Sequence, residues 1–172
     1  DPYEGFNWAM FDVHEGIDTV GIKPLAKGYD AVAPLPVKAS VGNFFGNVGD
    51  LFNGVNNGLQ GKPADGVSDI ARLLINSTVG IFGLFDVASE MGLEKHNEDF
   101  GQTFARWGAG DGGYLFIPVI GPRTVRDTVG FVADTYADPV SYLQRIPTRN
   151  GAYVLRAVDI RASLLPSDKV VE

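Results

Sequence analysis

Cysteine, clustered positive charge and long apolar runs are all missing from this chain of 172 residues. Without cysteine there is no disulfide, which is compatible with the cytosol and with a periplasmic domain that needs none. Acidic residues outnumber basic ones 21 to 14, giving a formal net charge of −7, and no run of Lys and Arg occurs. A general nucleic-acid binder needs a basic stripe, so that class is excluded.

The longest stretch without a charged residue is LLINSTVGIFGLF, residues 73–85. It is too short and too polar to span a bilayer, which takes about 20 mostly apolar residues in a helix. The sequence therefore predicts no spanning helix. The chain begins at Asp1-Pro2 without a visible signal sequence, as a trimmed mature protein would, and its length suits one domain over residues 1–172.

Apolar residues do recur at helical spacing along most of the chain. Near the N-terminus an Asp-Pro start, typical of a helix, precedes a stripe that consists of Phe6, Met10, Val13, Ile17 and Val20. Trp8 and Phe11 lie beside this stripe and widen its apolar face. Pro24 then begins a second short segment, which Pro34 and Pro36 end.

The next apolar stripe, from Val37 to Leu59, is interrupted by Gly42, Gly46, Gly49, Gly54 and Gly58. Each glycine inside a helix costs about 1 kcal/mol relative to alanine. We therefore expect tertiary or lipid contacts to hold this segment, or the segment to be broken into shorter pieces. Gly42 and Gly46 form a small-residue face that lets another backbone approach closely.

The second half predicts shorter elements. A helix from Pro63 is expected to turn a set of apolar residues inward: Val67, Ile70, Ala71, Leu74 and Ile75. Further helices are expected over 84–91, over 122–137, and from a cap at Thr148 or Asn150 to Leu165. YLFIPVI, residues 114–120, is the best candidate for a strand or hairpin. The fold class predicted is mostly α, with several medium and short amphipathic helices and at most one short β-hairpin.

The segment GAGDGG, residues 108–113, matches the GxGxxG pattern of a dinucleotide-binding turn. A real fingerprint needs a buried strand before the glycines and a helix after them. Here a helical pattern precedes them, and Pro118 prevents a long helix from following; Asp134, at the distance of a ribose carboxylate, is weak support. We interpret the glycines as a loop that needs positive φ or close backbone approach.

No catalytic constellation is evident. His14 is interpreted as a surface residue, and the cluster Glu94, His96, Glu98 and Asp99 fits no zinc spacing and is interpreted as a charged loop. Neither histidine lies near a convincing serine motif, and no metal or cofactor is expected. The many phenylalanines beside glycines leave two alternatives: amphipathic helices that lie in a membrane interface, or a core in which aromatics pack against small residues. Composition alone favours the core.

Several long stretches, however, resemble the MlaA/VacJ lipoproteins of Gram-negative outer membranes. In one consistent order they are DPYEGFNWAMFDVHEGID, NFFGNVG, LLINSTVGIFGLFDVASEMGL, NEDFGQTFARWGAGDGGYLFIPVIGP and TVRD, from Asp1 to about Leu165. The chain has Trp8 where the family usually has Arg, and Gly113 where it usually has Pro. It also lacks the lipid-bearing N-terminal cysteine and the C-terminal region of most members.

The resemblance implies a ring of helices around an amphipathic channel, on the periplasmic face of the outer membrane beside a trimeric porin. Such a protein is not an enzyme. It removes mislocalised phospholipid from the outer leaflet and passes it to a periplasmic lipid-carrier protein, which maintains lipid asymmetry. The alternatives are a soluble helical interaction module without lipid transport and a lipid-acting hydrolase.

With this resemblance, the aromatic and glycine residues become candidates for contact with lipid, in the channel or at the membrane: Phe6, Trp8, Phe11, Phe44, Phe45, Phe82, Phe85, Trp107, Gly108, Gly110, Tyr114 and Phe116. The polar line of the first helix, Asp12, His14, Glu15 and Asp18, is expected to face water or the channel. The glycine loop and the apolar run after it are expected to form a flexible edge of the lipid passage, which Gly110→Val would distort.

Overall fold

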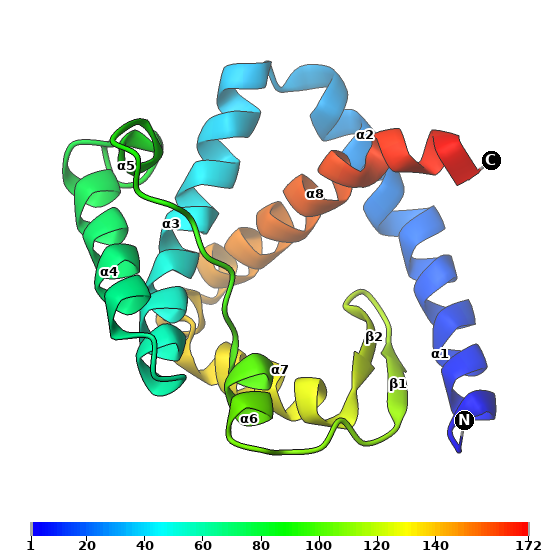
Figure 1. The fold of residues 1–172 in the computed structure, drawn as a ribbon. Coiled ribbons are helices and arrows are strands. Elements are labelled where there is room, and N and C mark those ends of the chain that lie inside the picture. Colours follow the sequence, from blue (N-terminus) through cyan, green and yellow to red (C-terminus); the bar gives the residue numbers. More distant parts are fainter. Residues whose placement is uncertain (1, 172) are drawn as a thin grey trace.

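The helices of the chain are arranged as an open ring (Figure 1). The computed structural model describes residues 2–171, with side chains through residue 168. The elements in chain order are α1 (Glu4–Ile17), the π-helical turn η1 (Asp18–Ile22), α2 (Lys23–Val32), α3 (Leu35–Leu59), α4 (Pro63–Thr78), α5 (Val87–Glu90), α6 (Phe100–Arg106), β1 (Tyr114–Ile117), β2 (Gly121–Thr124), α7 (Val125–Ala137), the 3-10 turn η2 (Pro139–Tyr142) and α8 (Ile146–Val171). The mostly α fold, its short hairpin and its ring arrangement are confirmed.

The N-terminal side of the ring is a continuous helical rod that meets the hairpin. α1 continues through η1 into α2, with Pro24 in the first turn of α2, where its missing N–H is tolerated. α2 is the short segment expected between Pro24 and Pro34. The Asn7 side chain donates to the carbonyl of Tyr114 (3.0 Å) and accepts from the N–H of Phe116 (2.8 Å). α1 and β1 therefore close the ring at this point (Figure 1).

On the opposite side, α3 and α4 cross at two glycines. A Cβ atom on Gly54 would lie 2.8 Å from Cδ1 of Ile70, and one on Gly66 would lie 2.9 Å from the carbonyl oxygen of Gly54. The expectation of a close backbone approach at Gly42 and Gly46 is wrong, because those positions face the side chains of Asp159 and Lys95. α3 itself is unbroken over 25 residues, held by these tertiary contacts.

The inward face of α4 is largely polar, so the expected inward apolar stripe is only partly right: Ile70 packs against Gly54 of α3, whereas two other members of the stripe are exposed. Val67 is 70% exposed and Leu74 60% exposed. The buried residues of this helix are Gly66, Asp69, Arg72 and Asn76. Apolar periodicity locates the helix correctly, but it cannot tell which face meets the protein.

The remaining wall is made by α6, α7 and the hairpin. A Cβ on Gly130 of α7 would overlap the backbone of Gly101, so α6 and α7 pack in direct contact. α7 begins after Thr124, whose hydroxyl accepts from the N–H of Asp127. Pro122, expected to start this helix, instead lies in β2 opposite Phe116.

α8 connects the two sides of the ring. It begins at Ile146, before either expected cap, and continues past Leu165 through Pro166. The helix runs from η2 past α3 to α2 (Figure 1), where the Tyr29 hydroxyl donates to Asp159 at 2.9 Å. Burial and this carboxylate raise the pKa of Tyr29 to about 12.

Candidate functional site

The ring encloses an amphipathic cavity of about 1200 Å³. Its wall comes from α1, η1, α3, the segment before α6, the hairpin, α7 and α8. The apolar part of the lining includes Phe45, Phe52, Phe131, Ile160 and Leu164. The charged part is Asp18, Glu98, Asp99, Arg123, Asp134, Asp138, Arg156, Arg161 and Asp168. The cavity is larger than the roughly 300–1,000 Å³ of an ordinary small-molecule pocket.

Two arginines of α8 are held at the cavity wall by carboxylates. Arg161 donates to both carboxylate oxygens of Asp18 (2.9 and 3.0 Å) and of Asp168 (3.2 and 2.8 Å). These acceptors raise the pKa of Arg161 further above its usual range. Arg156 donates to Asp138 at 2.6 Å and lies over the Phe45 ring at 4.9 Å. The bridges to Asp18 and Asp138 join α8 to other sides of the ring.

Asp134 of α7 is a half-buried carboxylate in the same wall. Burial is the main reason that its pKa is raised to about 6. The N–H of Phe100 donates to this carboxylate at 3.1 Å and has the opposite effect, because it lowers the pKa. The negative charge of Asp99 raises the pKa further, and the positive charge of Arg123 lowers it. Asp134 therefore changes charge just below neutral pH.

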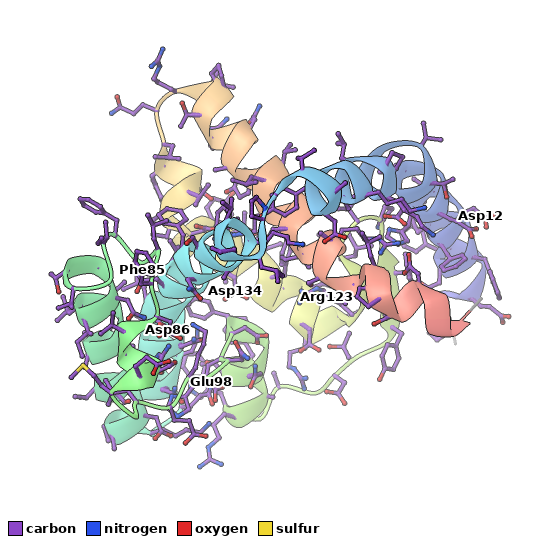
Figure 2. All side chains as sticks on the ribbon, turned by 90° about the horizontal axis from the view of Figure 1, so that it is seen from above. Asp12, Phe85, Asp86, Glu98, Arg123 and Asp134 are labelled. Atoms are coloured by element: carbon purple, nitrogen blue, oxygen red, sulfur yellow. The ribbon has the colours of Figure 1, made fainter. Side chains whose placement is uncertain are left out.

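Arg123 of β2 is held differently from the two arginines of α8. Its guanidinium lies 4.9 Å from the centre of the Phe131 ring, and its buried Nε has no hydrogen-bond partner among the residues described. Figure 2 shows Arg123 and Asp134 in the interior of the molecule, between the helices. No hydrogen bond or ion pair joins the two side chains within the part of the chain described.

A buried polar network supports the α3–α4 side of the ring. Arg72 is fully buried and donates to Asp50 (3.3 Å), to Asp86 (2.9 and 3.1 Å) and to the carbonyl of Leu93 (2.6 Å). Lys95 adds a 2.9 Å contact to Asp50. Buried charges need such paired and hydrogen-bonded surroundings. The network fixes the segment between α4 and α6 against α3.

Further along α3, the Asn53 side chain positions the charged loop that contains His96 and Glu98. Asn53 donates to the carbonyl of His96 (2.5 Å) and accepts from the N–H of Glu98 (2.8 Å). His96 contacts Asp69 at 2.7 Å, which raises the pKa of the imidazole. Glu98 pairs with Lys62 at 2.9 Å, and Asp99 caps α6. Within the described residues, no group of three or more such side chains is arranged to hold a metal ion.

Outside the cavity, the usual distribution of polar and apolar side chains is inverted. The largest fully buried side chains described are polar: Arg72, Asn56, Asn57, Thr103, Asp50 and Asp69. Large apolar side chains lie on the surface instead, as with Phe82 (77% exposed) and Trp8 (62%). The expectation from composition, a core in which aromatic side chains pack against small residues, is therefore wrong. Extensive exposed apolar surface marks contact with lipid or with another protein.

The candidate lipid-contacting residues fall into three groups. Phe45 lines the cavity. Phe116 is half-buried on the hairpin, with its ring 5.4 Å from that of Phe11 and 5.5 Å from that of His14. The others are exposed, namely Phe6, Trp8, Phe11, Phe44, Phe82, Phe85, Trp107, Gly108, Gly110 and Tyr114. Most of the set therefore lies on the exposed surface.

The polar line of α1 is divided between the cavity and the surface. His14 and Asp18 line the cavity, and the imidazole of His14 accepts from the N–H of Val119 at 3.0 Å. His14 therefore ties α1 to the hairpin tip, a role not expected of a surface histidine. Asp12 and Glu15 are exposed, and Figure 2 shows Asp12 at the outer edge of the molecule.

The glycine loop has positive φ, though not at the position expected. Gly108 (φ 95°) and Gly112 (φ 71°) have left-handed backbone, whereas a Cβ on Gly110 would meet no atom within 4 Å. The reason given for a distorting effect of Gly110→Val is therefore wrong. Arg126 binds Asp111 and so fixes the loop to α7, and the hairpin tip at Val119–Gly121 reaches the cavity.

Of the charged residues of the cavity wall, sequence reasoning expected only Asp18 to face water or the channel. It did not identify Arg123, Arg156 and Arg161, and it considered Asp134 only for a nucleotide. No local pattern marks them. Ring closure brings together positions 18, 123, 134 and 161, which are far apart in the sequence.

Fold and site together define a class of protein. Proteins of this class are amphipathic helical rings with an apolar exterior. Residues 2–171 contain no helix that is long and hydrophobic enough to cross a bilayer. The MlaA lipoprotein family model matches residues 1–172, and the chain belongs to this family.

Named relatives agree with this membership. An uncharacterized protein of Rickettsia typhi is 37% identical over 174 residues, which cover all of this chain and 69% of the relative. The intermembrane phospholipid transport system lipoprotein MlaA of Escherichia coli is 33% identical, over 98% of this chain and 68% of the relative. A solved structure that concerns the structural basis for maintenance of bacterial outer membrane lipid asymmetry superimposes with a TM-score of 0.84 at 33% identity, covering 99% of this chain and 87% of that one.

Proposed function

We propose that this chain transports phospholipid at the outer membrane and takes part in maintaining the asymmetry of that membrane. The proposal agrees with the name of the Escherichia coli relative and with the subject of the solved structure that the fold matches. In this proposal residues 1–172 act as one transport domain, without catalysis.

The observation that carries the proposal is the inverted distribution of side chains around a central cavity. Apolar surface on the outside of the ring suits the acyl region of a lipid layer, where it replaces contact with water. Charged groups inside the ring provide a path for a headgroup that the surrounding hydrocarbon would exclude. A phospholipid needs both environments at once, and this ring offers both.

We infer the finer steps as part of the same proposal. A ring seated in the periplasmic leaflet lets a mislocalised headgroup enter the cavity from the outer leaflet and leave toward a periplasmic lipid-carrier protein. Exposed aromatics on α1 and on the segment between α4 and α5 provide surface for the lipid layer and for a trimeric porin. A plain interaction module would not need the cavity.

Lipid extraction tests the proposal. The purified chain is incubated with vesicles of bacterial phospholipid, separated from them, and extracted with organic solvent for mass spectrometry. Intact diacyl phospholipid in the extract is the expected result. Its absence contradicts transport, and release of free fatty acid or lysophospholipid at a catalytic rate would support the hydrolase alternative instead.

A further inference from the structure

Arg123 has hydrogen-bonding capacity in the cavity that the protein itself does not use. The other two arginines of the lining are engaged by carboxylates, Arg161 by Asp18 and Asp168 and Arg156 by Asp138. For Arg123 the described residues provide only the face of the Phe131 ring, at 4.9 Å. Its buried Nε has no acceptor there. A buried donor without an acceptor destabilises the protein unless a ligand or water satisfies it.

Two carboxylates of the cavity likewise have no basic partner. Asp134 accepts the backbone N–H of Phe100, and Asp99 accepts that of Gln102, but neither forms an ion pair with a basic side chain of the described residues. The negative charge of Asp99 disfavours the ionised form of Asp134. A cation placed between them would relieve this repulsion.

Arg123 and Asp134 therefore present opposite charges that lie close together yet are not bonded to each other. Arg123 lies over the ring of Phe131, which is one turn before Asp134 on α7, and both charged residues line the same cavity. A ligand with an anionic and a cationic group joined by a short linker would satisfy both side chains. Guanidinium is well suited to phosphate, and carboxylate to ammonium.

We propose that Arg123 and Asp134 form a recognition site for a zwitterionic lipid headgroup, with the phosphate on Arg123 and the ammonium on Asp134 beside Asp99. The site selects phosphatidylethanolamine over an anionic phospholipid such as phosphatidylglycerol, which lacks the ammonium. This inference rests on the proposed function, because it names the headgroup that the same cavity admits. The raised pKa of Asp134, about 6, leaves its carboxylate ionised at neutral pH, and a bound ammonium would lower that pKa.

The test uses vesicles with equal parts of diacylphosphatidylethanolamine and diacylphosphatidylglycerol. The chain is loaded from these vesicles near neutral pH, separated and extracted, and the amount and ratio of the two lipids are measured. Arg123→Gln and Asp134→Asn are compared with Arg145→Gln and Asp12→Asn, which change exposed residues outside the cavity. Asparagine keeps an acceptor for the N–H of Phe100, and thermal melts check that each variant folds.

We expect the unmodified chain and both controls to be enriched in phosphatidylethanolamine. Asp134→Asn lowers the ratio of the two lipids by about fivefold, and Arg123→Gln lowers the amount of both by a similar factor, the size expected from one lost charge-assisted hydrogen bond in a partly solvated site. Phosphoethanolamine in solution should compete with loading, and inorganic phosphate should compete much less.

Three results would overturn the inference, and they are distinguishable. Variants that match the unmodified chain in amount and ratio leave transport standing and remove the headgroup site. Equal competition by inorganic phosphate shows that Arg123 is a plain anion site. A chain that takes up no lipid at all contradicts the proposed function as well.

Discussion

Arg72 and Asp86 are joined by two hydrogen bonds, of 2.9 and 3.1 Å, between a fully buried guanidinium and a carboxylate that is 27% exposed. The pair connects α4 to the end of the apolar loop that follows it. In this loop Ile81 (φ 52°) and Phe82 (φ 55°) have left-handed backbone, which side chains rarely adopt. Such strained residues persist only where surrounding contacts hold them. The pair thereby supports an exposed, apolar part of the surface.

Asp86→Asn should destabilise the chain at neutral pH by about 2 kcal/mol. Burial opposes ionisation of Asp86, but hydrogen bonds from Ser89 and Asn76, with the charge of Arg72, lower its pKa from 3.8 to about 2. A lowered carboxylate pKa adds stability above 3.8 that is lost as the pH falls toward 2. Denaturant unfolding should therefore show a difference in unfolding free energy between the unmodified chain and Asp86→Asn that becomes smaller in acid. A difference that stays constant with pH would contradict the assignment to charge. Asp12→Asn is the control.

Gly112→Val should destabilise the chain, whereas Gly110→Val should leave it nearly unchanged. Gly112 has positive φ, and its Cβ would lie 2.9 Å from Cβ of Val125, while Gly110 has open space. Strain of this kind costs roughly 1–3 kcal/mol, or several degrees in Tm. Thermal melts of the two variants test this prediction. Equal melting temperatures would show that the loop adapts to valine at either position.

Asp134→Asn should raise the Tm at about pH 8 by a few degrees and change it little at about pH 4. The folded pKa of Asp134, about 6, lies above its unfolded value of 3.8. The native state then binds the proton more tightly, so this residue's contribution to stability declines as the pH rises from 4 through 6. Because Asp134 is only half-buried, the effect is smaller than the full pKa shift implies. An equal gain at both pH values would show that charge is not the cause.

Trp8 should report contact with lipid from the outside of the ring. It is exposed on α1, with its ring 6.1 Å from that of Phe11. In a Trp107→Phe chain, we expect its fluorescence to shift to shorter wavelength when phospholipid vesicles are added, because the indole leaves water. Emission that responds neither to vesicles nor to a trimeric porin would place α1 away from both.

Helix positions could largely be predicted from the sequence, because proline, glycine and apolar spacing act locally. Pro24 and Pro34 bound α2, and apolar spacing locates α4. The side on which α4 is buried could not be predicted, since apolar spacing is the same whether the stripe faces a core or a lipid layer. Val67 and Leu74 therefore pointed inward in the prediction and lie outward in the structure. The resemblance to a lipid-handling family, rather than periodicity, resolves that ambiguity.

The site was less accessible to prediction than the fold. Aromatic residues could be identified as lipid-facing candidates from their type, and one of them, Phe45, lies in the cavity wall. The charged wall depends on long-range closure, as in the pairing of Asp18 with Arg161 over 143 positions. In the sequence, Arg123 is a single charge between Pro122 and Thr124. The residues that surround it in space come near it only when the chain folds into the ring.

Filling the cavity tests the central claim most directly. Ala157 lines the cavity, whereas Ala105 of α6 is exposed and outside it. Phospholipid per protein after loading from vesicles should fall severalfold in Ala157→Trp, because the added indole narrows the cavity that Ala157 lines. The matched Ala105→Trp should load normally. If Ala157→Trp remains folded and carries as much phospholipid as the unmodified chain, lipid does not pass through the ring, and the account is contradicted.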